Sequence, residues 1–349
     1  KSIGGNKMPN REATSVIFGF DFQANAAIVL ALENLNNLQS LRLESSYEDI
    51  DITLFNGSHI LAQAKSVTEP MTDFRNVRKN LTKALTSLSE GYTELNQNEI
   101  NCSNLIYITN SRNPLKQPQG TMNVFDGKTN RQYHELPTVA QEIIDNIITN
   151  EKIQIEKKLF AVYLLPFETD NRNERYKAII RVIDDFLGMN NIQIAGLSNK
   201  ILEKWTALIL TNGSTRDTQI VLRKKDLIWP IINIIINPDN LISTFRDYFD
   251  ESEYSEIIRN YITLIEQNTE RVESFTKVIY EFSQYRDSSI GNQKILNFAE
   301  KFFRTYIDEF LLNELPVDIQ EKLSKVIIYC ILTKRHEIDK LKKGANICG

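Results

Sequence analysis

The segment from Leu41 to Ser66 constrains the fold most strongly, because it holds two strand patterns on either side of an Asn-Gly pair. The run IDITLF precedes Asn56-Gly57, and the run HILAQAK follows it. Asn-Gly between two such runs is the strongest short signal for a β-hairpin. The sequence therefore predicts an extended segment followed by a hairpin.

Polar side chains gather on one face of each predicted strand, because residues two apart in a strand share a face. The first strand carries Asp49, Asp51 and Thr53 on this face, and the second carries Gln63 and Lys65. If the opposite, apolar faces pack on one core, the hairpin displays two carboxylates, an amide oxygen and an ammonium group together.

This set of groups suits metal-assisted hydrolysis of a phosphodiester. Carboxylate and amide oxygens are ligands of hard divalent cations such as Mg²⁺, and such a cation lowers the pKa of a bound water. A nearby lysine stabilises charge that develops on a phosphate or helps to activate the water. From spacing alone, the alternative is a solvated polar face of a sheet, and it stays open here.

The order of these residues resembles the PD-(D/E)XK nuclease superfamily: a helix with a leading Phe-Gln, a Glu, an Asp that opens a strand, and Gln-x-Lys closing the next. More narrowly, GFDFQANAAIVLALENL followed by ESSYEDIDITLF and ILAQAKS resembles the Cap4-like (DUF4297-type) nuclease domain of bacterial anti-phage systems. The resemblance covers Phe18 to Ser66 well and extends weakly to about residue 230. Gln63 stands where many superfamily members have Asp or Glu, but Gln-x-Lys is familiar in the narrower family.

The resemblance implies an α/β (α+β) restriction-endonuclease-like N-terminal domain, with a mixed central sheet flanked by helices. It also implies a DNA endonuclease that depends on Mg²⁺ or Mn²⁺. Asp49 and Gln63 would be the main metal ligands, Asp51 or Glu44 would complete the charge, and Lys65 would assist the water or the transition state. Asp49 and Asp51 share a face, and Asp49 is favoured because it opens the strand.

The implied biological role is that of a cytoplasmic effector of anti-phage defence that cuts double-stranded DNA. Two alternatives remain: an effector that cuts RNA, and a scaffold or binding protein that kept a nuclease-like fold without turnover. No aromatic stacking platform for single strands is evident in the sequence.

Nucleic-acid binding needs a local basic patch, because the net charge of −4 argues against a basic surface overall. Arg75, Arg78, Lys79 and Lys83 have spacings that would place them on one helix face. Their alternative is a solvated helix face. Gln23 would begin a helix and, as the resemblance implies, reach the metal site; otherwise it bonds to backbone at the helix entry.

Apolar residues recur at helical spacing in four segments of the first two thirds of the chain. These segments are Gln23–Leu35, Asp73–Gly91 ended by its glycine, Thr138–Thr149 with a capping box to Gln141, and Glu174–Leu187. Buried strands are predicted at residues 104–111 and 159–167, and WTALILTNG fits either a strand or a helix. Residues 1–15 and 112–136 are predicted to be a loose segment and a long loop.

The chain of 349 residues, 42% hydrophobic and 25% charged, is long enough for two domains. Helical periods dominate after Leu227, which predicts a domain at 1–226 and an all-α region at 227–349. That region would bind a partner, such as a motor ATPase or a sensor protein, or drive homo-oligomer formation. We expect no membrane span, because no apolar run reaches eighteen residues.

Other chemistries lack their motifs. The three histidines and three cysteines are widely spaced and form no zinc-site pattern. The chain contains no P-loop, no dinucleotide fingerprint and no nucleophile elbow.

Overall fold

The computed structural model describes residues 11–117, 124–169, 171–236, 251–269 and 271–347. The chain divides into two compact units. Unit 1 comprises Lys1–Phe186 and Ser198–Leu227, and unit 2 comprises Leu187–Leu197 and Ile228–Gly349. The division after Leu227 lies next to the domain boundary expected from sequence. Residues 187–197 belong to unit 2, whereas the sequence-based prediction placed them in the domain 1–226.

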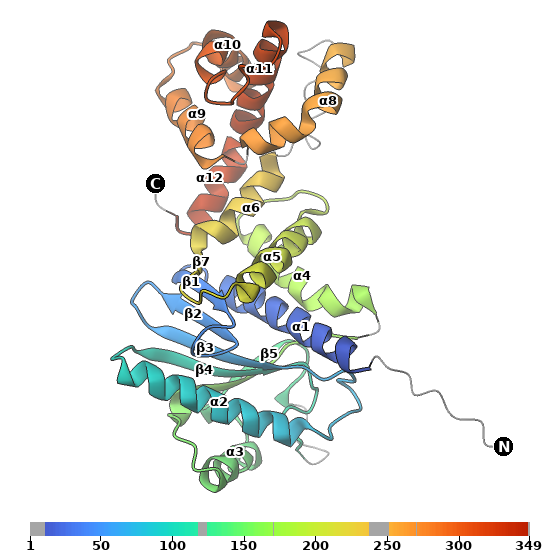
Figure 1. Ribbon diagram of the computed structural model, residues 1–349, viewed down its shortest axis with the longest axis vertical. Helices are drawn as coiled ribbons and strands as arrows, with labels where there is room; N and C mark the ends of the chain where they lie inside the picture. The colour runs from blue at the N-terminus through green and yellow to red at the C-terminus, as the bar shows by residue number, and fades with distance from the viewer. Residues whose placement is uncertain (1–10, 118–123, 170, 237–250, 270, 348–349) are drawn as a thin grey trace, which may run out of the picture. The chain divides into compact units, whose positions relative to one another are not determined.

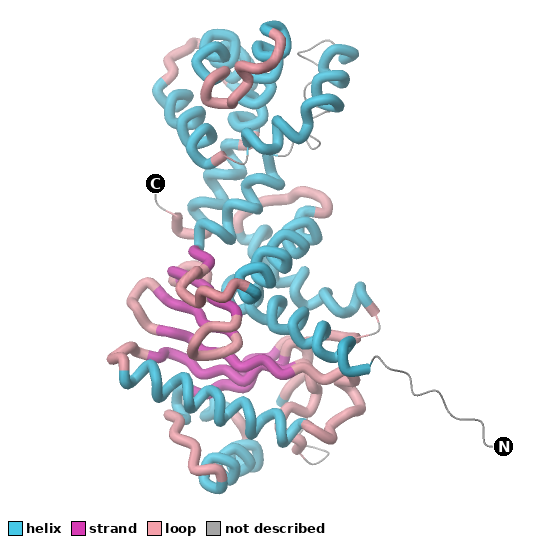
Figure 2. Tube along the Cα trace, viewed as in Figure 1, coloured by secondary structure: helices cyan, strands magenta, loops and turns pink. Residues whose placement is uncertain are grey.

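Unit 1 is built on a mixed sheet, which confirms the α/β class with a mixed sheet (Figures 1 and 2). Seven described strands follow the order β5-β6-β4-β3-β2-β1-β7. Their bounds are β1 Leu38–Leu43, β2 Ile50–Leu54, β3 His59–Lys65, β4 Cys102–Thr109, β5 Thr129–Gln132, β6 Phe160–Leu164 and β7 Leu222–Arg223. The β3–β4 and β4–β6 pairs are parallel, and the other pairs are antiparallel.

Helices cover both faces of this sheet (Figure 1). The helices that begin in unit 1 are α1 Arg11–Glu33, α2 Val77–Gln97, α3 Thr138–Asn150, α4 Arg172–Met189 and α6 Lys224–Ile236, and α5 Leu197–Ser214 lies almost wholly within it. Leucines of α2 pack with Leu61, Leu105 and Tyr107 of the central strands, and α3 adds Ala140 and Ile144 to this core. The α1 helix lies against the other face (Figure 1). The central strands of the sheet, including those of the hairpin, thus lie between helices on both faces.

The first helix is longer than expected, because it begins at Arg11 and not at Gln23. Residues 11–15, predicted to be loose, are therefore helical; residues 1–10 lie outside the described part. The rings of Phe18 and Phe22 both contact Phe167, at centroid distances of 5.2 and 5.4 Å. These contacts extend the buried stripe of α1 toward its N-terminus, so that Gln23 lies in the middle of the helix.

Part of α1 is long and apolar enough to cross a membrane by length and composition. Polar residues such as Asp21 and Asn25 interrupt it, so this finding does not contradict the expectation that no apolar run reaches eighteen residues. The segment Thr14–Glu33 is the one helix of the described residues that meets this test, and 56% of its apolar window is buried inside the protein. A helix with one face in a protein core can have the same composition. One side of α1 is buried in this way, whereas Val16, Ile17 and Phe20 are exposed.

The α2 helix was predicted with the wrong bounds. It begins at Val77, four residues after Asp73, and it continues through Gly91 to Gln97. Arg75 lies before the helix and forms an ion pair with Asp73 at 2.9 Å, so it does not share a helix face with the other basic residues. A Cβ atom on Gly91 would lie 2.4 Å from the carbonyl oxygen of Tyr47. Gly91 therefore allows a close approach between elements and does not end the helix.

Two further segments differ from the sequence-based predictions, and a third decides between two alternatives that the sequence left open. The edge strand β5 lies inside the predicted loop 112–136, of which residues 118–123 are outside the described part. The capping box at Thr138 does not form, because Pro137 is the N-cap and Gln141 donates to the carbonyl oxygen of Leu136 at 2.8 Å. WTALILTNG is helical, as part of α5.

Unit 2 is helical in its described residues, as expected for the C-terminal region. Its later helices are α8 Glu251–Thr269, α9 Val272–Gln284, α10 Gly291–Tyr306, α11 Val317–Thr333 and α12 Arg335–Gly344. Phe298 lies at the centre of an aromatic core and contacts the rings of Phe282, Tyr285, Phe302 and Tyr306 at 4.8 to 6.4 Å. The buried faces of α9 and α10 are thus used for packing.

Candidate active site

The register of the hairpin brings Asp49 beside Gln63. Ile50 pairs with Ala62, so the residues one step further along the two antiparallel strands, Asp49 and Gln63, lie opposite each other. The backbone N–H of Ala64 donates to Asp49 Oδ2 at 3.1 Å, and Lys65 Nζ lies 3.7 Å from the same oxygen. Asp49, Gln63 and Lys65 therefore form one cluster at the end of β3.

A tight turn between β1 and β2 adds two more carboxylates to this cluster. Glu44 has a φ of 52°, which is uncommon for a residue with a side chain, and its N–H donates to the carbonyl oxygen of Asp49 at 2.7 Å. Ser45 Oγ accepts hydrogen bonds from the N–H groups of Tyr47 and Glu48, each at 3.0 Å. These bonds fold residues 44–49 back so that Glu44, Glu48 and Asp49 lie close together.

Glu48 is the main residue of the site that sequence reasoning missed. Its side chain is only 6% exposed. Oε2 accepts hydrogen bonds from Gln63 Nε2 at 2.8 Å, Ser87 Oγ at 3.0 Å and the Asp49 N–H at 3.0 Å, whereas Oε1 is buried without a hydrogen-bond partner. Burial, followed by the charge of Asp49, raises the pKa of Glu48 to about 8.

Glu44 is half-buried and borders the same hollow as Glu48 and Asp49. Burial, and next the charge of Asp49, raise the pKa of Glu44, while a hydrogen bond from the Gln23 side chain and the charges of Lys65 and Arg42 lower it. Gln23, on α1, thus reaches Glu44 and with it the edge of the cluster. Its Oε1 atom is buried and has no hydrogen-bond partner.

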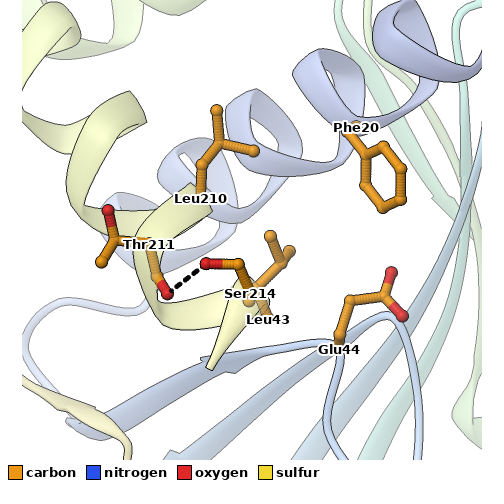
Figure 3. A pocket seen from close by; sticks show the side chains of 7 residues that line it. Phe20, Leu43, Glu44, Leu210, Thr211 and Ser214 are labelled. Carbon is orange, nitrogen blue, oxygen red and sulfur yellow. Dashed lines mark hydrogen bonds between the residues drawn. The ribbon is translucent and has the colours of Figure 1, made fainter. Parts of the chain in front are cut away.

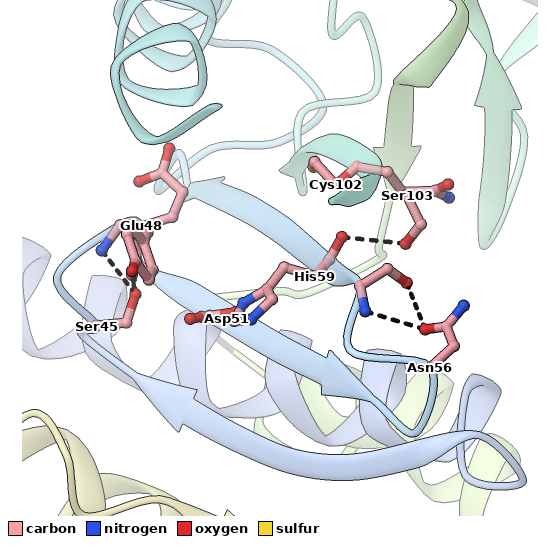
Figure 4. Close-up of polar contacts among 10 residues, drawn as sticks. Ser45, Glu48, Asp51, Asn56, His59, Cys102 and Ser103 are labelled. Atoms are coloured by element: carbon pink, nitrogen blue, oxygen red, sulfur yellow. Dashed lines mark hydrogen bonds and ion pairs between the residues drawn. The ribbon is translucent and has the colours of Figure 1, made fainter. Parts of the chain in front are cut away.

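Asp51 lies on the same strand face but is engaged elsewhere. It is opposite Leu61 in the register, and its Oδ1 lies 2.7 Å from His59 Nδ1 (Figure 4). The edge of the His59 ring in turn contacts Tyr47 at a centroid distance of 6.0 Å. The structure therefore brings Asp49, and not Asp51, together with Gln63 and Lys65.

The predicted basic patch is only partly assembled. Arg78, Lys79 and Lys83 lie on α2, with Lys79 and Lys83 exposed, whereas Arg75 precedes the helix and pairs with Asp73. In the described part of the chain, no hydrogen bond or ion pair joins these groups to Asp49. They remain candidates for contacts to a nucleic acid that extends beyond the cluster.

The donor set of the cluster fits a hard divalent cation such as Mg²⁺. Because the Gln63 amide nitrogen donates to Glu48, the Gln63 carbonyl oxygen is left for a second interaction, and the buried Glu48 Oε1 lacks a partner. Among the described residues, no three His, Cys, Asp or Glu side chains gather closely enough to hold a metal by themselves. A cation here would therefore use the amide oxygen of Gln63 and water in addition to carboxylates.

Two hollows meet at Glu44. The first, which we call the acidic hollow, has a volume of about 310 Å³. Its carboxylates are Glu44, Glu48, Asp49, Glu90 and Glu94. The second, which we call the apolar hollow, has a volume of about 670 Å³ and lies between α1, the end of β1 and α5 (Figure 3). Its lining consists of Phe20, Leu43, Glu44, Leu210, Thr211, Gly213 and Ser214.

Comparisons of the chain with protein-family models, with curated proteins and with solved structures gave no match. The class of site is therefore defined by its own chemistry: one buried and two half-buried carboxylates, an amide and a lysine at the end of a hairpin in a mixed sheet.

Proposed function

We propose that this chain is a metal-dependent phosphodiester hydrolase that cuts DNA internally, with a restriction-endonuclease-like fold in unit 1. The observation that carries the proposal is the convergence on Asp49 Oδ2 of the Lys65 ammonium at 3.7 Å and the Ala64 N–H at 3.1 Å, beside Gln63. The element order α1-β1-β2-β3-α2-β4 adds support, because it matches the order of helix, hairpin and Gln-x-Lys strand on which the family resemblance rests.

In this proposal, Asp49, the Gln63 carbonyl oxygen and Glu48 would hold Mg²⁺ or Mn²⁺. A bound cation of this kind lowers the pKa of a water ligand and neutralises charge on a phosphate. Asp49 is already oriented by the Ala64 N–H, and Glu48 orients the Gln63 amide through its hydrogen bond. These contacts preorganise the oxygens before any substrate binds.

Besides the cation, the side chain of Lys65 would supply positive charge to the site. Its ammonium group lies beside Asp49, and the side chain as a whole is 28% exposed, so it can reach a phosphate from the surface. There it would donate a hydrogen bond to an oxygen that gains charge in the transition state. Glu44, held by Gln23, would add negative charge beside Asp49.

The biological part of the proposal comes from the family resemblance. We infer an effector of anti-phage defence in the cytoplasm, with unit 2 as the part that binds a partner such as a motor ATPase or a sensor, or a second copy of the chain. The helical content of unit 2 agrees with such a role but is also typical of many other proteins.

The test is cleavage of supercoiled plasmid DNA by the full chain with Mg²⁺ or Mn²⁺, with EDTA as control. Asp49→Ala and Lys65→Ala should each abolish cleavage, and Lys152→Ala, in the exposed turn that follows α3, should retain cleavage. Cleavage that survives both substitutions or persists in EDTA would refute the proposal. If the wild-type chain cuts RNA but not DNA, RNA replaces DNA as the proposed substrate. If it cuts neither, the inactive scaffold is favoured.

A further inference from the structure

The charge distribution around Asp49 leaves one side open to a nucleic-acid strand. The acidic hollow contains five carboxylates, from Glu44, Glu48, Asp49, Glu90 and Glu94. A phosphate backbone that continued into this hollow would approach the exposed carboxylates of Glu90 and Glu94, which repel it at short range. In the apolar hollow, Glu44 is the one acidic residue of the lining. A strand with its phosphate at Asp49 is therefore directed toward the apolar hollow.

Phe20 is the aromatic side chain of the apolar hollow, and it is not used in the core. Its neighbours along α1, Phe18 and Phe22, are buried against Phe167, whereas Phe20 is 48% exposed. Figure 3 shows its ring on the same side of the hollow as the Glu44 carboxylate, with Leu210 and Ser214 of α5 across from them. An exposed aromatic ring next to a phosphate site is the group on which nucleobases stack.

The other walls of the hollow favour a flat apolar group over a specifically recognised one. The Thr211 hydroxyl donates to the carbonyl oxygen of Ala207 at 2.8 Å, and the Ser214 hydroxyl donates to that of Thr211 at 2.9 Å. Because both hydroxyl protons are used within α5, they do not form a donor pattern that would select one base. The close packing of α5 on β1 depends on Gly213, where a Cβ would lie 2.8 Å from Leu43 Cδ2.

We propose that the apolar hollow binds the base of an unpaired nucleotide next to the scissile phosphate, with Phe20 as the stacking ring. The substrate would then be single-stranded nucleic acid or a duplex opened at the cut site, with little preference for one base. This inference rests on the proposed function for the position of the phosphate. No stacking platform is evident in the sequence, because the exposure of Phe20 follows from its place on α1 and is invisible in a linear pattern.

The test measures binding separately from cleavage. The probe is a short single-stranded DNA oligonucleotide that carries 2-aminopurine, whose fluorescence falls when the base stacks on an aromatic ring, and the same oligonucleotide in RNA form is run in parallel. Binding of the full chain is measured with Ca²⁺ in place of Mg²⁺. The variants are Phe20→Ala, Phe20→Trp, and Phe55→Ala as a matched control, because Phe55 is also an exposed phenylalanine, at 60%.

The wild type should quench the probe, and Phe20→Ala should weaken binding about 5- to 100-fold. Phe20→Trp and Phe55→Ala should bind within about 3-fold of the wild type, a difference too small to reflect loss of a stacked ring. Absence of quenching by the wild type, or unchanged binding by Phe20→Ala, would overturn the base site. Plasmid cleavage by the same samples separates the two proposals. Quenching without cleavage would refute the nuclease and keep the base site. Cleavage with unchanged binding by Phe20→Ala would keep the nuclease and refute the base site.

Discussion

The side-chain amide of Gln63 donates to Glu48 Oε2 at 2.8 Å, and both residues are more than nine-tenths buried. A carboxylate in this position is costly to the fold, because burial and the neighbouring Asp49 disfavour its charged form. Such a cost in folding free energy is expected at a site that binds a cation, because the charge of the bound cation would stabilise the ionised form of Glu48.

Glu48→Gln should therefore stabilise the protein in the absence of metal, and more so at higher pH. The pKa of Glu48 is about 8 in the folded state, against an ordinary value of 4.5. Folding therefore takes up a proton between these two pH values, so the wild type loses stability as pH rises from about 4.5 to 8. Thermal unfolding in EDTA should show a gain of roughly 1 to 3 kcal/mol at pH 8 and little change at pH 4.5. The control is Glu90→Gln, an exposed residue of the acidic hollow. A loss of stability at pH 8 would contradict the prediction.

Asp49 and Asp51 should differ sharply in their effect on activity. Asp49→Asn removes a charge that faces Lys65 and Gln63, and cleavage should fall by at least about 100-fold. Asp51→Asn keeps a hydrogen-bonding group beside His59, and the rate should stay within about 3-fold, since its partner lies outside the cluster. Initial rates of plasmid cleavage measure both variants. Equal losses would show that the register assigns the wrong aspartate.

Divalent cations should stabilise the wild type through Asp49. At a Mg²⁺ concentration 100 times the Kd, binding adds about 2.7 kcal/mol to the free energy of unfolding, which thermal unfolding with and without Mg²⁺ detects. The shift should disappear in Asp49→Ala and persist in Lys65→Ala, because the lysine is not a metal ligand. A shift that survives in Asp49→Ala would place the cation elsewhere.

Gly91→Ala should destabilise unit 1 by about 1 to 3 kcal/mol and reduce activity. The added methyl group would press on the Tyr47 carbonyl, 2.4 Å away, and push the turn that carries Glu48. The matched control is Gly19→Ala, inside helix α1 of the same unit, where the nearest atom to the new Cβ is Ser66 Oγ at an ordinary contact distance of 3.9 Å; alanine there should stabilise by about 0.8 kcal/mol. Chemical denaturation compares the two, and equal effects would mean that helix α2 can shift without cost.

The hairpin of the site was predictable because its signals are local. Asn56-Gly57 marks the position of the turn. The loop that forms has three residues, 55–57, with Gly57 at a φ of 79°, and this loop length gives the register that sets Asp49 against Gln63. The choice between Asp49 and Asp51 stayed open in the sequence, since residues two apart share a face. The choice follows only when Ile50 is seen paired with Ala62.

The rest of the site depends on contacts that no local pattern encodes. Glu48 precedes β2 in an irregular turn, and what marks it is the approach of Ser87 and Gln63 from distant segments. Gly91 resembles a helix stop because the close approach of Tyr47 is invisible in the sequence. The first helix was predicted too short because Phe18 and Phe22 gain their significance from Phe167.

Arg42, next to the turn of the site, is almost fully buried and donates to the carbonyl oxygens of Thr215 and Ile220. These partners are 173 and 178 residues away along the chain, and the adjoining strand β7 completes the sheet beside β1. During synthesis, the edge of β1 that pairs with β7 therefore stays unpaired until most of unit 1 has left the ribosome. A ribosome-bound chain thus carries the residues of the cluster well before the surroundings of Glu44 are complete, which delays the finished site until the end of unit 1 has been made.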